Sequence, residues 1–217
     1  MNLSSRTLLF LPLLLLAGCS SQHTPDFTAS GYLADRGAVR IWRKAPSHTT
    51  HLQTVYTPFT GQGEETTDYY WQQDKLISIA RHIAGEQQES VTLRFDRDGS
   101  LNFMQRQLAG RRESLSADAI ALYQFDAGRM RAISDDLLKG RVTLLQGHWT
   151  PSGTVMLCHG GKTTPDFESN DARYITQHQQ ESGQPLSIAW LKAPGGTQLL
   201  LATPKDICPE EPQADSF

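Results

Sequence analysis

Histidine and cysteine are the side chains of this sequence that could bind a metal ion or act as a nucleophile. His48 and His51 are three residues apart, a spacing that aligns two ligands on one face of a helix. A strand-like stretch follows them, and on a strand residues three apart point to opposite faces. We therefore expect two solvated histidines rather than a metal site. A second group of side chains could come together in the folded protein, although their spacing in the sequence does not require this. These are His82, His148, Cys158 and His159.

Residues 160–163 resemble the end of a phosphate-binding loop, with two glycines followed by Lys162 and Thr163. A true loop of this kind needs a glycine five residues before Gly161, and Met156 occupies that position. The segment is therefore predicted to be a glycine turn after a strand.

Asp96 and Asp98, followed by Gly99, resemble the opening of a calcium-binding loop. Its closing acidic ligand should come eleven residues after Asp96, where the sequence has Gln107. Alternating apolar residues flank the segment where a calcium loop would have helices. We therefore predict a hairpin turn.

Motifs of the common catalytic and cofactor-binding sites are absent from the 217 residues. The sequence lacks GxSxG, SxxK, HExxH, CxxC and GxGxxG. We therefore expect a non-enzymatic protein with no cofactor, no catalytic residue and no dedicated metal ligand.

The first 18 residues have the parts of a secretory signal peptide. Arg6 supplies a positive charge, an almost uninterrupted apolar run extends from Leu8 to Leu16, and small residues precede Cys19. The run is too short for a membrane-spanning helix, which needs about 20 apolar residues, and Pro12 interrupts it. We expect residues 1–18 to direct export and then to be removed.

The sequence at residues 16–19, Leu-Ala-Gly-Cys, resembles the lipobox of bacterial lipoproteins. The resemblance implies that the Cys19 thiol carries a diacylglyceryl group and that its new amino group is acylated, which together give a stable membrane anchor. Ser20, in place of Asp, resembles lipoproteins passed to the outer membrane. We expect an anchor on the periplasmic side of the outer membrane; the inner membrane and an incidental cysteine after an ordinary signal are the alternatives.

Cys158 and Cys208 are the two cysteines outside the lipobox. An oxidising compartment favours a disulfide between them. The alternative is a metal-binding or nucleophilic role for Cys158, because His159 lies beside it.

Composition describes an ordinary globular protein. Of its residues, 38% are hydrophobic and 20% are charged, and the mean hydropathy is −0.42. A pI near 6.1 provides no basic surface field, so nucleic acid is not an expected partner.

The organisation along the chain suggests one domain between two polar ends. We expect a lipidated N-terminus and flexible tether over residues 19–30, a single β-rich periplasmic domain over residues 31–208, and a disordered tail over residues 209–217, which is rich in Pro and Glu.

Alternating apolar and polar residues separated by turn residues predict antiparallel hairpins. Turns are expected at Gln73-Asp74, at residues 96–99, at residues 150–153 and at residues 193–196. One segment differs: over residues 116–139 the apolar spacing is helical, although Asp126 interrupts it. The predicted fold is therefore α+β and mainly antiparallel β, as a sheet, sandwich or open barrel, with one amphipathic helix at residues 116–139.

Aromatic side chains on the predicted strands could form a platform for a glycan or peptide. The candidates are the run of residues 69–71 (Tyr-Tyr-Trp) and Trp42, which lies near Arg40 and Arg43. Strand aromatics more often pack in a core, which is the interpretation we favour.

Three longer segments resemble the YjaH-like family of uncharacterised enterobacterial envelope lipoproteins. They are residues 31–44, residues 101–106 and residues 140–144. The resemblance implies a lipoprotein of the cell envelope and supplies no catalytic or ligand residues.

The leading functional hypothesis is a lipid-anchored, non-enzymatic interaction module that contacts the membrane through Cys19 and binds an envelope protein, peptidoglycan or a small ligand. One alternative is a periplasmic metal or small-ligand sensor that uses some of the histidines. The other is a hydrolase whose site the sequence does not identify.

Overall fold

The computed structural model describes residues 25–61 and 63–217. The expected signal peptide (residues 1–18), Cys19 and the first part of the expected tether lie outside these described residues. Within the described residues, neither helix combines the length and the apolar character that crossing a membrane requires.

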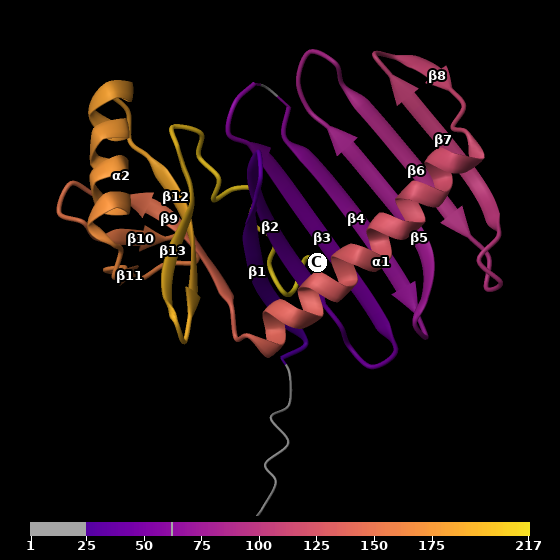
Figure 1. Cartoon of the computed structure of the whole chain (residues 1–217), viewed down its shortest axis with the longest axis horizontal. Helices are drawn as coiled ribbons and strands as arrows, with labels where there is room; N and C mark the ends of the chain where they lie inside the picture. The colour runs from indigo at the N-terminus through magenta and orange to yellow at the C-terminus, as the bar shows by residue number, and fades with distance from the viewer. Residues whose placement is uncertain (1–24, 62) are drawn as a thin grey trace, which may run out of the picture.

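The larger sheet is an antiparallel meander in which every strand pairs with its neighbour in the sequence (Figure 1). Its eight strands are β1 Phe27–Ala34, β2 Gly37–Lys44, β3 Thr49–Pro58, β4 Glu65–Gln72, β5 Lys75–Ile83, β6 Glu89–Phe95, β7 Leu101–Leu108 and β8 Arg111–Glu113. The hairpins expected around residues 73–74 and 96–99 are confirmed as the β4–β5 and β6–β7 connections.

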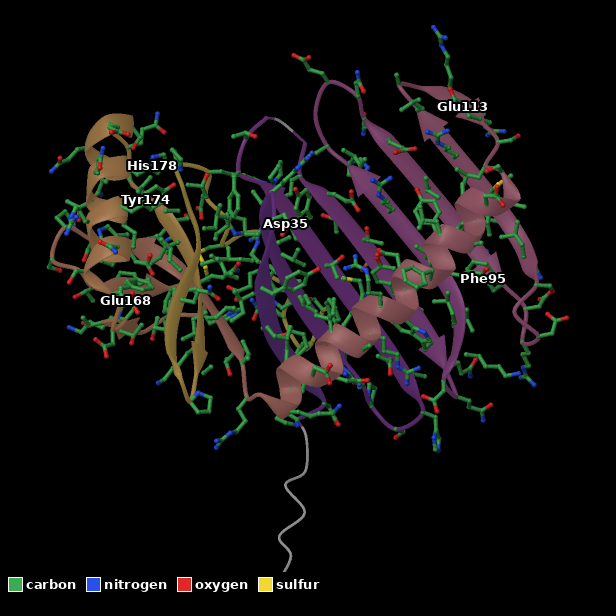
Figure 2. The ribbon with its side chains drawn as sticks, in the orientation of Figure 1. Asp35, Phe95, Glu113, Glu168, Tyr174 and His178 are labelled. Carbon is green, nitrogen blue, oxygen red and sulfur yellow. A yellow bond between two sulfur atoms is a disulfide. The ribbon has the colours of Figure 1, made fainter. Side chains whose placement is uncertain are left out.

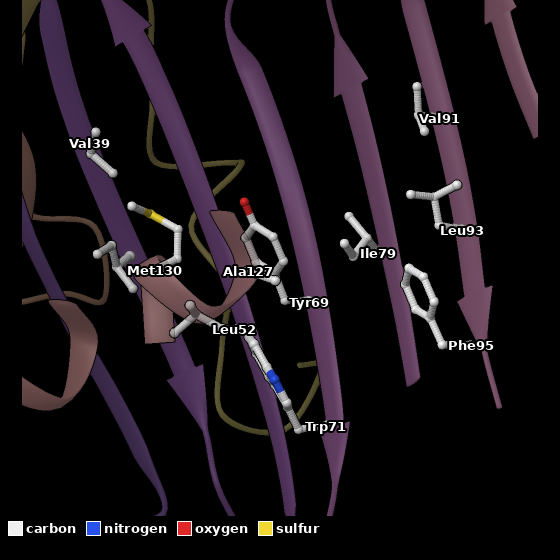
Figure 3. Close-up of a cluster of buried hydrophobic side chains, with 11 residues drawn as sticks. Val39, Leu52, Tyr69, Trp71, Ile79, Val91, Leu93, Phe95, Ala127 and Met130 are labelled. Carbon is white, nitrogen blue, oxygen red and sulfur yellow. The ribbon is translucent and has the colours of Figure 1, made fainter. Parts of the chain in front are cut away.

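One long helix, α1 (Ala117–Lys139), crosses the front face of this sheet diagonally (Figure 1). Ser116 caps its start by accepting a hydrogen bond from the Ala119 N–H at 3.2 Å, and Gly140 ends it. Ala127 and Met130 of α1 are buried against the apolar side chains of the strands (Figure 3). The helix predicted at residues 116–139 is confirmed.

A second, five-stranded sheet and a second helix follow α1. The strand order is β11-β10-β9-β12-β13, and the bounds are β9 Thr143–Trp149, β10 Val155–Leu157, β11 Lys162–Thr163, α2 Ser169–Ser182, β12 Ser187–Ala193 and β13 Gly196–Thr203. The β9–β10 and β12–β13 hairpins and the glycine turn before Lys162 are as predicted. The α+β, mainly antiparallel fold class is confirmed.

The expectation of a single helix was wrong, because α2 is a second one. Ile175 is its only fully buried residue, and Tyr174 is 54% exposed. A helix with so little apolar surface has a weak 3.6-residue pattern, so the periodicity did not reveal it.

The two sheets meet at the back of β1–β3, the face opposite α1. There Trp42 and Val55 pack with Leu144, Leu191 and Leu200 of the second sheet. Strands β2 and β3 thus contribute alternate residues to two cores, since Val39, Ile41 and Leu52 face α1.

Both expected ends of the domain differ from the structure. The flexible tether was expected to extend to residue 30, but β1 begins at Phe27 because residues 27–34 pair in register with β2. The tail at residues 209–217 was expected to be disordered, but it packs behind the sheet. The Phe217 ring lies 5.5 Å from the Phe27 ring and 4.0 Å from the His51 ring, and the Lys44 ammonium donates to the Phe217 carbonyl at 2.9 Å.

Gly147 in β9 and Gly128 in α1 provide a matched pair of glycine-to-alanine substitutions. A Cβ at Gly147 would lie 2.2 Å from the Met156 carbonyl oxygen, whereas a Cβ at Gly128 meets nothing within 4 Å. We expect Gly147→Ala to lower the free energy of unfolding by at least about 2 kcal/mol, because backbone must shift. Gly128→Ala should raise it by about 0.5–1 kcal/mol through helix propensity. Denaturant unfolding measures both; equal effects would contradict the β9–β10 packing.

Candidate functional site

A groove lies between α1 and the front face of β1, β3 and β4. Its cavity has a volume of about 440 Å³, which is within the range of small-molecule sites. Aromatic and charged side chains line it together: Tyr32, Asp35, Tyr56, Glu65, Tyr69, Asp126 and Arg129, with Met130 at its apolar side. Asp35, in the β1–β2 turn, is one of the lining residues and is labelled in Figure 2.

The polar floor of the groove is built around Asp126 of α1. Its Oδ2 accepts a hydrogen bond from the Tyr69 hydroxyl at 3.0 Å. Its Oδ1 accepts from the Arg129 guanidinium, at 2.6 Å from Nη2 and 3.0 Å from Nε. Helix and sheet are therefore joined at the groove by a hydrogen bond, while the Arg129 side chain remains 48% exposed.

Two tyrosine hydroxyls of the groove are held protonated. Burial, with Asp126 beside the hydroxyl, raises the pKa of Tyr69 far above its usual value. Burial also raises the pKa of Tyr32, although Arg129 opposes the shift. These phenols are therefore protonated at physiological pH and able to donate hydrogen bonds.

A second cavity of about 550 Å³ adjoins the groove, and Tyr32 lines both. Its apolar walls come from the end of α1, from the strands of the second sheet and from the segment before α2, and include Leu137, Val142, Phe167 and Leu191. Glu168, labelled in Figure 2, lies at its rim. The second cavity is therefore lined by apolar side chains together with the acidic residues Asp166 and Glu168.

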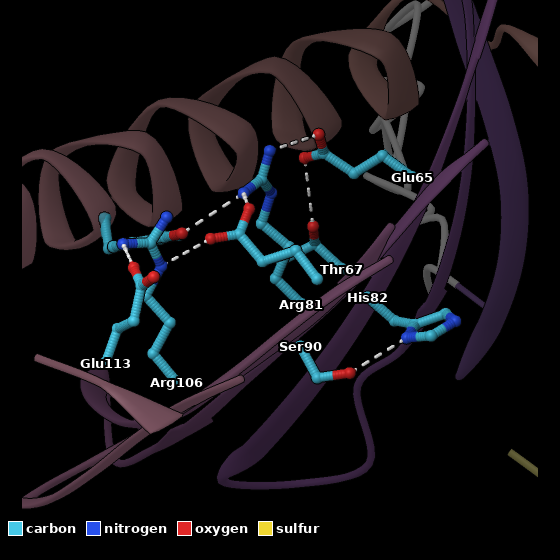
Figure 4. A network of polar contacts seen from close by, with 9 residues as sticks. Glu65, Thr67, Arg81, His82, Ser90, Arg106 and Glu113 are labelled. Carbon is cyan, nitrogen blue, oxygen red and sulfur yellow. Dashed lines mark hydrogen bonds and ion pairs between the residues drawn. The ribbon is translucent and has the colours of Figure 1, made fainter. Parts of the chain in front are cut away.

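A chain of ion pairs fills the front face beyond the groove, beneath the first turns of α1 (Figure 4). Arg81 contacts Glu65 at 2.7 Å and Glu89 at 3.0 Å. Arg106 contacts Glu89 at 2.6 Å and Glu113 at 2.9 Å. Glu65 therefore links this network to the groove, and the alternating charges hold its carboxylate in place.

Behind the sheet, Arg40 is a buried cation at the junction of the two sheets. Its guanidinium donates to the Glu64 carboxylate at 3.0 Å and to the Gln146 side-chain oxygen at 2.9 Å. Only 2% of the Arg40 side chain is exposed. Burial alone would raise the pKa of Glu64, but Arg40 and the ammonium of Lys205 hold it below its usual range.

The histidines of residues 25–61 and 63–217 do not form one cluster. His48 is exposed before β3, and the His82 Nδ1 lies 3.1 Å from the Ser90 hydroxyl on the larger sheet. The expectation that His51 is solvated was wrong, because Tyr70 and Phe217 stack on its two faces. His148 lies near Cys208, with reactive atoms of the two residues within 4.8 Å of each other, whereas the His159 Nε2 lies 3.1 Å from the Glu211 carboxylate. The disulfide predicted between Cys158 and Cys208 is present.

The aromatic side chains of the strands pack mainly in the hydrophobic core, which is the interpretation that the sequence favoured. Trp42, Tyr69 and Trp71 are at most 5% exposed, and Tyr70 stacks on His51. Arg40 lies over the Trp42 ring at 5.7 Å, inside the junction rather than at the surface.

The groove was not identified from the sequence, although two of its residues stood out there: Tyr69 as a strand aromatic and Asp126 within the predicted helix. Asp126 interrupts the apolar spacing of the predicted helix, and an acidic residue on the buried side of a helix needs a polar partner. Its partner, Tyr69, is 57 residues away along the chain, so only the fold reveals the pair.

Replacing Glu64 with Gln tests the buried ion pair. We expect Glu64→Gln to lower the free energy of unfolding by about 3 kcal/mol at pH 7, because Arg40 is left buried without its anion. The pKa of Glu64 is lowered in the folded state, so its contribution is present above its usual value of 4.5 and is lost as the pH falls through the folded pKa. The difference between variant and wild type should therefore shrink in acid.

Denaturant unfolding at a series of pH values measures this effect. Glu86→Gln, in the exposed turn between β5 and β6, is the control and should change stability by less than about 0.5 kcal/mol. A constant difference between wild type and Glu64→Gln at all pH values would contradict the assignment.

Comparison with known proteins gives a family and no activity. The model of a family described as "Protein of unknown function (DUF1481)" matches residues 29–213. The Escherichia coli (strain K12) protein described as "Uncharacterized protein YjaH" is 41% identical over 214 residues, which cover 98% of this chain and 93% of that protein. No solved structure matches. The resemblance to the YjaH-like family is therefore confirmed: the chain is similar to the YjaH protein over nearly its whole length and belongs to the DUF1481 family.

Proposed function

We propose that this protein is a non-enzymatic binding module of the bacterial envelope and that it binds a small ligand in the groove beside α1. The observation that carries the proposal is the cavity itself, which brings three tyrosine rings together with Glu65, Asp126 and Arg129 between a helix and a sheet. Pockets that bind small molecules combine an apolar lining with a few such polar groups.

The chemistry of the groove favours binding over catalysis. The raised pKa values of Tyr32 and Tyr69 keep their hydroxyls protonated. Asp126 is engaged by both Tyr69 and Arg129, so it is not free to activate water. The groove is therefore suited to hold a ligand in a fixed orientation.

The lining indicates the chemical class of the ligand. Tyrosine rings pack against the faces of partly apolar frames, while Glu65, Asp126 and the tyrosine hydroxyls supply hydrogen-bond acceptors and donors. The sugars of peptidoglycan fragments have this combination, because their partly apolar rings carry hydroxyl and acylated amino groups. We therefore assign the groove to a fragment of this kind, with an envelope protein as the competing partner.

Filling the groove tests this function. We expect soluble peptidoglycan fragments to bind the wild-type chain and to bind Ala34→Trp at least about tenfold more weakly, a loss of about 1.4 kcal/mol, because the larger ring occupies the cavity that Ala34 lines. Isothermal titration calorimetry measures the affinity. Native mass spectrometry of protein purified from envelopes reports any ligand already bound.

The matched control is Ala121→Trp on the exposed face of α1, which lies outside the lining of the groove. It should bind like wild type. If the wild-type chain binds no fragment and carries no extra mass, or if both tryptophan variants bind equally well, the groove is not the site.

We also propose that Cys19 anchors the domain to the periplasmic side of the outer membrane. The support is the lipobox-like sequence at residues 16–19 and Ser20 after it. The described domain begins soon afterwards, at Phe27, so an anchored domain would lie close to the lipid surface.

Replacing Cys19 tests the anchor. The wild-type chain should sediment with the outer membrane and incorporate labelled palmitate, because several acyl chains hold it at the bilayer. Cys19→Ser should do neither and should be recovered in the soluble periplasmic fraction. Cys208→Ser, which keeps Cys19, is the control for the loss of any cysteine. An unlabelled wild-type chain in the soluble fraction would contradict the anchor.

A further inference from the structure

Four side chains with metal-binding atoms gather at one side of the second sheet. Reactive atoms of His148, Asp206 and Cys208 all lie within 4.8 Å of one another. The His148 Nε2 is 2.9 Å from the Asp206 Oδ1. Cys158 is the fourth member, because its sulfur is bonded to that of Cys208. Two sulfurs, one imidazole and one carboxylate are a donor set that tetrahedral zinc accepts.

Two separate segments of the chain position these four residues: β9 with the residues after β10, and the segment after β13. His148 lies in β9, and the Cys158 N–H donates to the carbonyl of Gln146, two residues earlier in β9, at 3.1 Å. His148 pairs with Met156 of β10, and Cys158 comes two residues after Met156. Because paired residues, and residues two apart on a strand, share a face, Cys158 and His148 lie on the same side of the sheet. Asp206 and Cys208 follow β13, and the Cys208 N–H donates to the Asp206 carboxylate at 3.0 Å.

With the disulfide formed, only two of the four groups can hold a metal. A disulfide sulfur is a poor ligand, because zinc binds the thiolate. His148 and Asp206 alone are a weak pair, with side chains 46% and 55% exposed. The affinity of the site for a metal ion therefore depends on the state of the two sulfurs.

We propose that the Cys158–Cys208 disulfide masks a zinc site whose ligands are Cys158, Cys208, His148 and Asp206. A dithiol reductant supplies two electrons and two protons, the S–S bond breaks, and the reductant leaves as its own disulfide. Zn²⁺ then replaces the two thiol protons, which pass to solvent as two Zn–S bonds form. Both cysteines are only partly buried, so a reductant can reach them.

Zinc is the metal class that this donor set selects among divalent ions. Thiolates exclude hard ions such as Mg²⁺ and Ca²⁺, and imidazole with one carboxylate completes a tetrahedron. The same four positions would hold the second sheet to the segment after β13 in both states, by the S–S bond or by the metal. The site would thus exchange one crosslink for another.

Zinc titration of the two redox states tests the proposal. The chain carries Cys19→Ala so that Cys158 and Cys208 are the only thiols, and a phosphine reductant opens the disulfide without competing as a thiol. We expect the reduced chain to bind one Zn²⁺ at least about 1,000-fold more tightly than the disulfide form. Cobalt substituted for zinc should show thiolate-to-metal charge transfer and the visible bands of a tetrahedral site.

Two variants separate the site from adventitious binding. His148→Ala in the reduced chain should weaken zinc binding at least about tenfold, whereas His82→Ala, an exposed histidine on the other sheet, should leave it unchanged. Equal affinities in the two redox states, or equal affinities for wild type and His148→Ala, would overturn the proposal.

Circular dichroism of the same samples addresses folding. The reduced chain with zinc should keep the β-sheet signal of the disulfide form. The variant Cys158→Ser/Cys208→Ser should not bind zinc tightly, whether or not it folds. A reduced chain that remains unfolded with zinc present, or tight binding by the double serine variant, would also overturn the proposal.

Discussion

The larger sheet has an apolar front face that must be removed from water, and α1 is the element among the described residues that covers it. An antiparallel sheet can leave one face solvated, but not the face that carries its hydrophobic residues. Ala127, completely buried, allows the helix to lie close to the strands, and Met130 fills the space beside it. Because one helix cannot cover eight strands, ion pairs complete the front face near β5–β8, and the groove remains along the uncovered edge of α1. The candidate site is therefore a consequence of this incomplete coverage.

The strands β1–β3 have a different role, since both of their faces are buried. The back of these strands packs on the second sheet. Charged residues that alternate along the strands with the apolar residues facing α1 therefore need ion-pair or hydrogen-bond partners at this junction. Arg40 is the clearest case: it lies between Val39 and Ile41, so the pleat directs its side chain to the junction, where Glu64 and Gln146 receive it. Packing of this kind explains why a guanidinium is buried between the two sheets. It also explains why the segment after β13 returns across the back of the larger sheet, where Lys205 contacts Glu64.

The sequence revealed local structure well and long-range structure poorly. The hairpins, the helix at residues 116–139 and the disulfide followed from alternation, capping and cysteine chemistry, each of which operates over short distances or on few residues. Helix α2 was missed because it buries little beyond Ile175. The packing of Phe217 on His51 and the groove around Asp126 depend on contacts between residues far apart in the chain, which no local pattern encodes. Two groove residues were marked in the sequence, Asp126 as a break in an otherwise apolar spacing and Tyr69 as one of the strand aromatics.

The order of the strands has a consequence for how the chain folds. Every pairing in the larger sheet joins neighbours in the sequence, so each costs little loop-closure entropy. In the second sheet, β12 must pair with β9 across the intervening β10, β11 and α2, which is a slower, less local event. We therefore expect the meander to form first during folding. Until the second sheet assembles, the apolar back of β1–β3, with Trp42 at its centre, is open to solvent and to other chains. That surface is where a partly folded chain is most prone to aggregate.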